Sequence, residues 1–297
     1  MTSYPETLHH YTTASGLCGI LEPVKLGPDW EKAVPSFKNN RRSISLWATD
    51  ARYLNDSAEI EYVTNELSDA LTKLAGGDNS DLNKNIKYVA NRLRKLDFTE
   101  TGSSFAHTVY VVCFCSGGNL LSQWRGYGAN GGGYSIEFNS DAIRDLFFPA
   151  FRSDDDMVGV EQDETALSAV RYGIDPEMIA RVASITVENE RLGLMSQAIK
   201  GLTLFKHEDF SAESEWRAVY PEISPILQFR TTAAGGIIPY VKLFRMQPPE
   251  QNASAIRSVL VGPGPDQNLR YEAVRQLLDQ RGFFDVTVNR SGTTYKG

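Results

Sequence analysis

The sequence has few of the residues that build metal sites or disulfide frameworks. It contains three cysteines and four histidines among 297 residues, and neither C-x-x-C nor H-E-x-x-H occurs. The C-F-C spacing places Cys113 and Cys115 on one face of a strand, where a disulfide between them would be strained. We therefore expect reduced, buried thiols and no metal site.

Long apolar runs and net positive charge are also lacking. No stretch approaches the roughly 18 apolar residues of a membrane span, and the first ten residues have neither the basic start nor the apolar centre of a signal peptide. We therefore expect a cytoplasmic protein without a membrane partner. The formal net charge is −7. Sequence-independent binding of duplex DNA needs a basic surface, so it is not expected.

What is present is the composition of an ordinary globular protein, with 41% hydrophobic and 23% charged residues. This length favours one elaborated domain over residues 1–297. A helical insertion is predicted over about 56–98, because apolar residues recur at helical spacing there. Its first stripe comprises Ile60, Val63, Leu67, Leu71 and Leu74. The acidic stretch at about 153–164 is predicted to be a solvated surface loop.

Residues 111–138 are the stretch around which we expect the chain to be organised. VYVVCFCS and GGYSIEF are short, rich in β-branched and aromatic residues and bounded by glycine, so we interpret them as two strands of a hairpin. The connection holds Trp124, Tyr127 and several glycines, which would let the backbone approach a flat ligand closely. The alternative is a packed connection around a buried tryptophan.

Residues 211–220, SAESEWRAVY, alternate between apolar and charged side chains. The pattern predicts a half-buried strand with Glu213, Glu215 and Arg217 on its polar face. That face either meets solvent or forms the wall of a cleft. In a cleft, Arg217 would hold one carboxylate ionised while another binds ligand hydroxyls.

LHHYTT, residues 8–13, is predicted to be a strand that breaks into a helix capped by a threonine or serine. His10 then lies at the end of the strand, and His9 points to the opposite face. A second strand is predicted over residues 43–49. Near the end of the chain, a GPGPD turn precedes a helix. That turn would be a weak phosphate site, because two prolines remove two amide donors.

The order of motifs is more specific than any one of them. LHHYTT, YLND-x-x-E, VVCFCS, QW-x-x-Y, GYSIEF, E-x-E-W-R and S-x-x-x-Y-K together resemble a broad bacterial family of unknown function, which in turn looks like a divergent relative of the ADP-ribosyltransferases. The resemblance implies an α+β fold with a mixed, mainly antiparallel split sheet and helices on its outer faces. It also implies that NAD is consumed as a substrate.

The implied activity is transfer of ADP-ribose to a macromolecule or to water, in the manner of a toxin or phage-defence effector. An inhibitory partner protein would fit such an enzyme. Glu215 matches the carboxylate that stabilises the oxocarbenium-like cation, and Glu213 matches the carboxylate beside it. His10 matches the first-strand residue that contacts the adenosine ribose. The second-strand position stays open among Trp47, Thr49 and Tyr53.

Further contacts with NAD are expected from aromatic, hydroxyl and cationic side chains close to these positions. They are Tyr11, Thr12, Trp124, Tyr127 and Arg217. Two other functions remain open. One is a non-catalytic module of the same fold that senses a nucleotide or binds a protein. The other is a metal nuclease, although no carboxylate spacing requires it.

Overall fold

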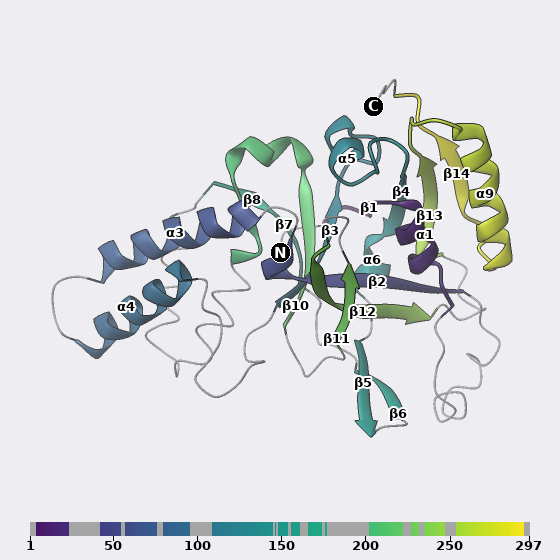
Figure 1. The fold of residues 1–297 in the computed structure, drawn as a ribbon. Helices are drawn as coiled ribbons and strands as arrows, with labels where there is room; N and C mark the ends of the chain where they lie inside the picture. The colour runs from purple at the N-terminus through teal and green to yellow at the C-terminus, as the bar shows by residue number, and fades with distance from the viewer. Residues whose placement is uncertain are drawn as a thin grey trace.

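The computed structural model describes residues 4–23, 42–54, 57–75, 80–95, 109–144, 146, 148–153, 156–160, 166–173, 176, 202–221, 227–231, 235–246 and 254–293. Within these residues the protein is mixed α+β and is built on a ten-stranded, mainly antiparallel sheet, as Figure 1 shows. The prediction of an α+β fold with a mainly antiparallel sheet is confirmed. No helix in the described part of the chain is long and apolar enough to cross a membrane.

The sheet divides at strand β3 (Val109–Cys115). One edge of β3 pairs along its whole length with β10 (Glu215–Pro221). The other edge is shared by two strands that each touch it only briefly. β1 (Thr7–Thr12) pairs with it at Cys115, and β2 (Ser43–Asp50) pairs with it at Val111 and Tyr110. Between these two points the edge of β3 is not covered by either strand, so the sheet opens into two arms.

The first arm runs from β2 to β12 (Ile237–Met246) and ends at β11 (Leu227–Thr231). The second arm runs from β1 through β4 (Tyr134–Asn139) and β13 (Ile256–Val261) to β14 (Thr287–Arg290). β7 (Ala166–Ala169) pairs with the far side of β10. Helix α9 (Gln267–Gln280) lies beside β13 and β14 at one end of the sheet (Figure 1).

The prediction of a hairpin over residues 111–138 is wrong, because β1 lies between β3 and β4 in the sheet. The connection instead contains the short helix α5 (Leu121–Gly126). The glycines of this connection contact the loop that follows β13. The Gly262 amide donates to the Gly133 carbonyl at 2.9 Å, and the Gly264 amide donates to the Gly131 carbonyl at 2.8 Å. A Cβ on Gly262 or Gly264 would collide with this backbone. The glycines therefore allow two loops to pack closely, which is a different role from the one expected.

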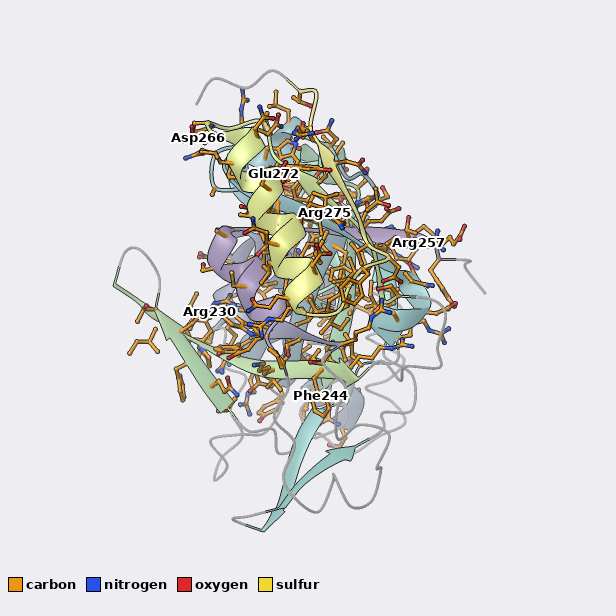
Figure 2. All side chains as sticks on the ribbon, turned by 90° about the vertical axis from the view of Figure 1, so that its right-hand side faces the viewer. Arg230, Phe244, Arg257, Asp266, Glu272 and Arg275 are labelled. Atoms are coloured by element: carbon orange, nitrogen blue, oxygen red, sulfur yellow. The ribbon has the colours of Figure 1, made fainter. Side chains whose placement is uncertain are left out.

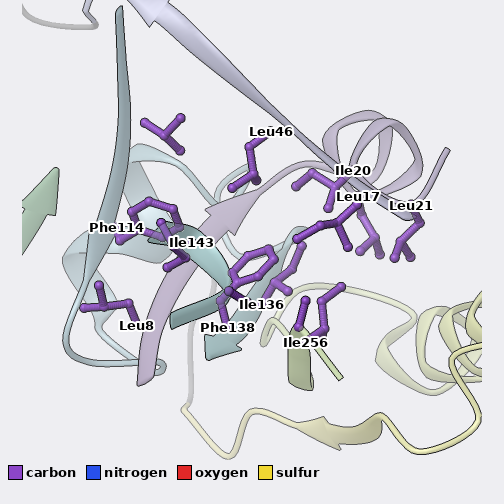
Figure 3. Close-up of a cluster of buried hydrophobic side chains, with 14 of the residues drawn as sticks. Leu8, Leu17, Ile20, Leu21, Leu46, Phe114, Ile136, Phe138, Ile143 and Ile256 are labelled. Carbon is purple, nitrogen blue, oxygen red and sulfur yellow. The ribbon is translucent and has the colours of Figure 1, made fainter. Parts of the chain in front are cut away.

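The main core packs side chains from both arms of the sheet against helix α1 (Ala14–Ile20), and Figure 3 shows part of it. Thr13 caps α1 as expected, because its Oγ1 accepts from the Gly16 amide at 3.2 Å. The short helix α6 (Ser140–Arg144) adds Ile143 to the same core. Apolar side chains from β1, β3 and β4 meet here, so the core fixes the strands that border the opening in the sheet.

A second core joins helices α3 (Ser57–Leu74) and α4 (Asp81–Arg94) to the other face of β3. These helices correspond to the predicted insertion and extend to one side of the sheet in Figure 1. Val63, Leu67 and Leu71 are buried in this core, as their spacing predicts. Leu74 was expected in the same stripe, but it is 52% exposed at the last position of α3.

Other expectations also need correction. Residues 156–160, expected in a loop, form strand β6 (Asp156–Val160), which pairs with β5 (Phe148–Ser153). The strand predicted from residue 211 begins only at Glu215, because a 3-10 helix, η3 (Glu208–Glu213), precedes it. Ser214, with a φ of 48°, makes the turn between the two elements. The thiol of Cys18, expected to be buried, is exposed. The apolar spacing between residues 176 and 204 also predicts helices, but this stretch lies largely outside the described residues.

Three short elements complete the description. η2 (Ala51–Tyr53) follows β2, and β8 (Arg171–Tyr172) pairs in parallel with β9 (Phe205–Lys206). The β8–β9 pair leads directly into η3 and β10. It therefore sets the position of Lys206 relative to the polar face of β10.

Candidate functional site

A cavity of about 810 Å³ occupies the opening between the two arms of the sheet. It is lined by residues of β1, β2, β3, β10, β11 and β12, so elements distant in the sequence form a single site. Most of the sequence-predicted site residues line it. They are His10, Tyr11, Thr12, Trp47, Tyr53, Tyr127, Glu215 and Arg217. Glu213 lines a smaller cavity that shares His10, Tyr127 and Glu215 with the first.

Glu215 is the most strongly held carboxylate of the site. Its Oε1 accepts from Arg217 Nε at 2.6 Å, and its Oε2 accepts from Arg217 Nη2 at 3.0 Å. Burial alone would raise the pKa of Glu215, but the Arg217 and Lys206 charges and a hydrogen bond from the Cys113 thiol outweigh it, so the pKa is lowered. Glu215 is therefore ionised at neutral pH although it is only 7% exposed.

Sequence reasoning missed Lys206, which completes this network from β9. Its Nζ donates to Glu213 Oε2 at 2.6 Å and to Glu215 Oε2 at 3.3 Å, and it lies 4.6 Å from the centre of the Phe210 ring. The Lys206 side chain is only 2% exposed. One lysine thus bridges the two carboxylates of the E-x-E motif, even though Glu213 lies on η3 and not on the strand.

His10 lies at the point where β1 separates from β3. Its Nδ1 is 2.8 Å from the Cys113 carbonyl oxygen, which can only accept, so Nδ1 carries a hydrogen and donates. Burial lowers the pKa of His10, and the nearby Arg230 charge adds to this, against the hydrogen bond to Cys113. The ring is therefore neutral at pH 7. Its Nε2 is then an acceptor suited to a ligand hydroxyl or amine.

Trp124, which was expected to contact NAD, does not line the cavity. Its side chain is 0% exposed, and its indole N–H donates to Asn119 Oδ1 at 2.9 Å. The same oxygen accepts from the Ser291 hydroxyl at 2.7 Å. Through Asn119, Trp124 thus connects α5 to Ser291, the first residue of the S-x-x-x-Y-K motif. This is the packed connection around a buried tryptophan that the sequence left as an alternative.

Tyr11 lines the cavity, but its ring and its hydroxyl are engaged by other residues of the protein. Its ring packs edge-on against Trp124 with 4.8 Å between centroids. Its hydroxyl donates to the Gly117 carbonyl at 3.0 Å and accepts from the Leu120 amide at 2.7 Å. With both roles of the hydroxyl engaged, Tyr11 holds the α5 loop in place. It contributes surface to the cavity and no evident hydrogen bond to a ligand.

The aromatic rings that line the cavity come from other positions. Trp47 stacks on Tyr240 with 4.9 Å between centroids and an interplanar angle of 29°. Tyr53 lies at the cavity too and is 43% exposed. Burial raises the pKa of Tyr127, so its hydroxyl stays a neutral donor. Trp47, Tyr53 and Tyr127 are therefore the predicted aromatic residues that can meet a ligand ring.

Arg230 of β11 is a second residue that sequence reasoning missed. Its Nη2 donates to Thr49 Oγ1 at 2.8 Å, and its guanidinium lies 6.0 Å from the centre of the Trp47 ring and 5.7 Å from that of Tyr240. In the register of the first arm, Thr49 lies opposite Tyr240 and Arg230 lies opposite Ile238. The pairing of β2, β12 and β11 therefore brings these side chains to one wall.

Among the described residues, no group of three or more histidine, cysteine, aspartate or glutamate side chains could hold a metal ion. Residues 123–218 match a family described as a protein of unknown function (DUF2971), and this range includes Tyr127, Glu213, Glu215 and Arg217. No curated protein and no solved structure matches the chain.

Proposed function

We propose that this protein binds NAD in the cavity between the two arms of the sheet and cleaves it, as an ADP-ribosyltransferase-like enzyme. The observation that carries the proposal is the pairing of an ionised, buried Glu215 with a neutral His10 on the walls of one cavity. The split sheet with these two residues at the opening is also what the motif resemblance implies. The acceptor would be a macromolecule or water.

The chemistry suits these groups. As the bond from nicotinamide to ribose breaks, its electron pair leaves with the nicotinamide nitrogen and positive charge develops on the ribose. A fixed carboxylate stabilises that charge most when it is already oriented, and Arg217 and Lys206 hold Glu215 in place. An acceptor lone pair then forms the new bond to the ribose, and Glu213 takes the acceptor proton.

His10 and the aromatic residues would bind the two ends of the substrate. The neutral His10 ring accepts a hydrogen bond from a ribose hydroxyl without adding a charge that opposes the cation. Trp47, Tyr53 and Tyr127 offer planar surfaces for the nicotinamide or adenine ring. These roles agree with the positions carried over from the family resemblance, except that Trp124 has none.

One observation favours a second candidate, a nucleotide-binding module without turnover. Both oxygens of Glu215 already accept hydrogen bonds, from Arg217 and Lys206. A carboxylate so fully engaged has less capacity to hold the ribose hydroxyls. In that case the same cavity would bind a nucleotide and report its presence to a partner protein.

Nicotinamide release from NAD, measured with and without cell extract, separates the two candidates. We expect Glu215→Gln to lower the rate at least about a hundredfold with little change in NAD affinity, because the lost charge acts mainly on the transition state. Glu215→Asp keeps the charge but moves it, and should also lose rate. Glu61→Gln, at an exposed position of α3, is the matched control.

The rate of nicotinamide release is compared at equal concentrations of folded protein, because Glu215→Gln removes the carboxylate that Arg217 and Lys206 share. Full cleavage by folded Glu215→Gln protein would contradict the mechanism. Binding of NAD by the wild-type protein without any cleavage would favour the module.

A further inference from the structure

Three cations line the cavity among the described residues, and they differ in how their charge is balanced. Lys206 and Arg217 form ion pairs with Glu213 and Glu215 inside the site. Arg230 has no carboxylate within ion-pair distance among the described residues, and its hydrogen bond goes to a neutral hydroxyl. Among the described residues, the first arm of the sheet therefore presents to the cavity a positive charge that no carboxylate balances.

Keeping that charge partly buried is unfavourable, and the surroundings of Arg230 compensate it only weakly. Burial lowers the pKa of Arg230, against the influence of Tyr240. The faces of Trp47 and Tyr240 attract the guanidinium at distances of 6.0 and 5.7 Å. Such cation–π contacts orient the group but do not neutralise it. An anion bound in the cavity would neutralise the charge of Arg230.

We infer that Arg230 and Thr49 form a phosphate-binding subsite on the first-arm wall, and that the ligand of the cavity carries a phosphate or diphosphate group. A guanidinium presents several N–H donors in a plane that matches two phosphate oxygens. Thr49 Oγ1 accepts from Arg230, so the hydroxyl hydrogen is directed elsewhere and can donate to the same anion.

The rings beside Arg230 narrow the ligand further. The stacked Trp47 and Tyr240 flank the guanidinium on the same wall and belong to the cavity lining. A planar base attached through a sugar to the phosphate could contact this pair while its phosphate meets Arg230. The cavity volume of about 810 Å³ is ample for a nucleotide. A nucleoside diphosphate, or a dinucleotide that contains one, is the class that fits.

This assignment rests on the proposed function in treating the cavity as a nucleotide site, but the two can fail separately. Cleavage of NAD that does not depend on Arg230 would overturn the phosphate subsite and leave the enzyme. Binding of ADP that depends on Arg230, in a protein that never cleaves NAD, would do the opposite.

Isothermal titration of the full chain with ADP, adenosine and inorganic pyrophosphate tests the subsite. We expect wild-type protein to bind ADP at least about tenfold more tightly than adenosine. Arg230→Gln should weaken ADP binding at least about tenfold, because hydrogen bonds between charged groups are lost, while adenosine affinity changes less than about twofold. Pyrophosphate should compete with ADP in the wild-type protein only.

The matched control is Arg257→Gln, which removes the same charge outside the cavity. Arg257 pairs with Glu6 at the start of β13, and Figure 2 shows it on the opposite side of the molecule from Arg230. It should bind ADP as the wild-type protein does. Equal losses in the two variants would mean a long-range charge effect and would overturn the subsite.

Two further outcomes also count against it. If Arg230 serves only to hold Trp47 and Tyr240, Arg230→Gln should weaken ADP and adenosine equally. Unchanged ADP affinity in Arg230→Gln, or no preference of the wild-type protein for ADP, rejects the subsite directly. Should Arg230→Gln fail to fold, Arg230→Lys and Thr49→Val take its place. Each is expected to weaken ADP binding a few-fold and to leave adenosine unchanged.

Discussion

The two charged walls of the cavity differ in how their cations are paired. On the β10 wall, Lys206 and Arg217 neutralise Glu213 and Glu215 through short hydrogen bonds, and these side chains are largely buried. On the β11 wall, Arg230 lies beside two aromatic rings, and within the described part of the chain its hydrogen-bond partner is a single hydroxyl. The cations of the first wall are paired with carboxylates in the structure, whereas no carboxylate pairs with Arg230 among the described residues.

From this difference we expect the two walls to have different roles. A complete network keeps its carboxylate fixed whether or not ligand is present, which suits a group that must act on a developing charge. An uncompensated cation gains most when a ligand arrives, which suits binding. The first wall should therefore matter most for stability and rate, and the second for affinity.

The largest expected effect comes from removing the lysine that joins the two carboxylates. Lys206→Met leaves Glu213 and part of Glu215 without a cation in a buried site, and breaking such a pair costs about 3–5 kcal/mol. We expect a loss of that order in the free energy of unfolding, measured by urea denaturation. Arg230→Gln, on the other wall, should lose much less.

A second substitution tests the cause of this loss. Adding Glu213→Gln to Lys206→Met removes the stranded charge, so part of the stability should return. If the double variant is as unstable as the sum of its single variants, the lysine and the glutamate are not coupled, and the comparison of the walls loses its basis.

Strand periodicity explains why part of the site was predictable. Alternation placed Glu215 and Arg217 on the same face of one strand, and it placed only one of the adjacent histidines, His10, on the side of the main cavity. His10 was expected at the end of its strand, but β1 continues to Thr12. These features are local, so each can be read from a short stretch of sequence. The fold class, in contrast, was implied by the resemblance carried by the order of motifs along the chain.

The rest depends on pairings that local patterns do not contain. Lys206 lies in a two-residue strand among apolar neighbours, and only its pairing with β8 and the turn at Ser214 bring it to Glu215. Arg230 reaches Thr49 through two strand pairings across the first arm. The signal for Lys206 was a lysine flanked by Leu202, Leu204 and Phe205. Arg230 had no comparable signal.

Trp124 shows the opposite error. A tryptophan in a glycine-rich connection was compatible with both a ligand platform and a packed turn, and the choice depended on Asn119 and Ser291. The hairpin failed for a similar reason. Nothing within residues 111–138 shows that β1, about a hundred residues earlier, is inserted between its two strands.

His10 of β1 forms the floor of the cavity between the two walls, and its removal is the next effect in size. We expect His10→Ala to weaken NAD binding about tenfold, because a hydrogen bond to the ligand and the ring itself are lost. His9→Ala should have a much smaller effect, since His9 does not line the main cavity. Fluorescence titration with NAD measures both. Equal losses would mean that the two histidines act only on the structure of β1.

The smallest effect is a dependence of stability on pH that separates the floor from the charged wall. Burial lowers the pKa of His10 below its ordinary value of 6.5, and burial lowers that of His9 against the influence of Glu137. Protonation therefore favours the unfolded chain, so this stability is present above about pH 6.5 and is lost as the pH falls further. Each histidine contributes at most about 1.4 kcal/mol per pH unit.

Glu215 acts in a different window, because its pKa is lowered from 4.5 and its contribution is lost only as the pH falls below that value. Among the groups described with a shifted pKa, His9 and His10 are therefore the ones that urea denaturation between pH 7.5 and 5.5 should report. His10→Asn keeps a donor for the Cys113 carbonyl but cannot titrate, so it should reduce the slope in this range. His9→Asn measures the share of the second ring. A double variant, His9→Asn with His10→Asn, that keeps the wild-type slope would show that neither histidine titrates as its burial requires.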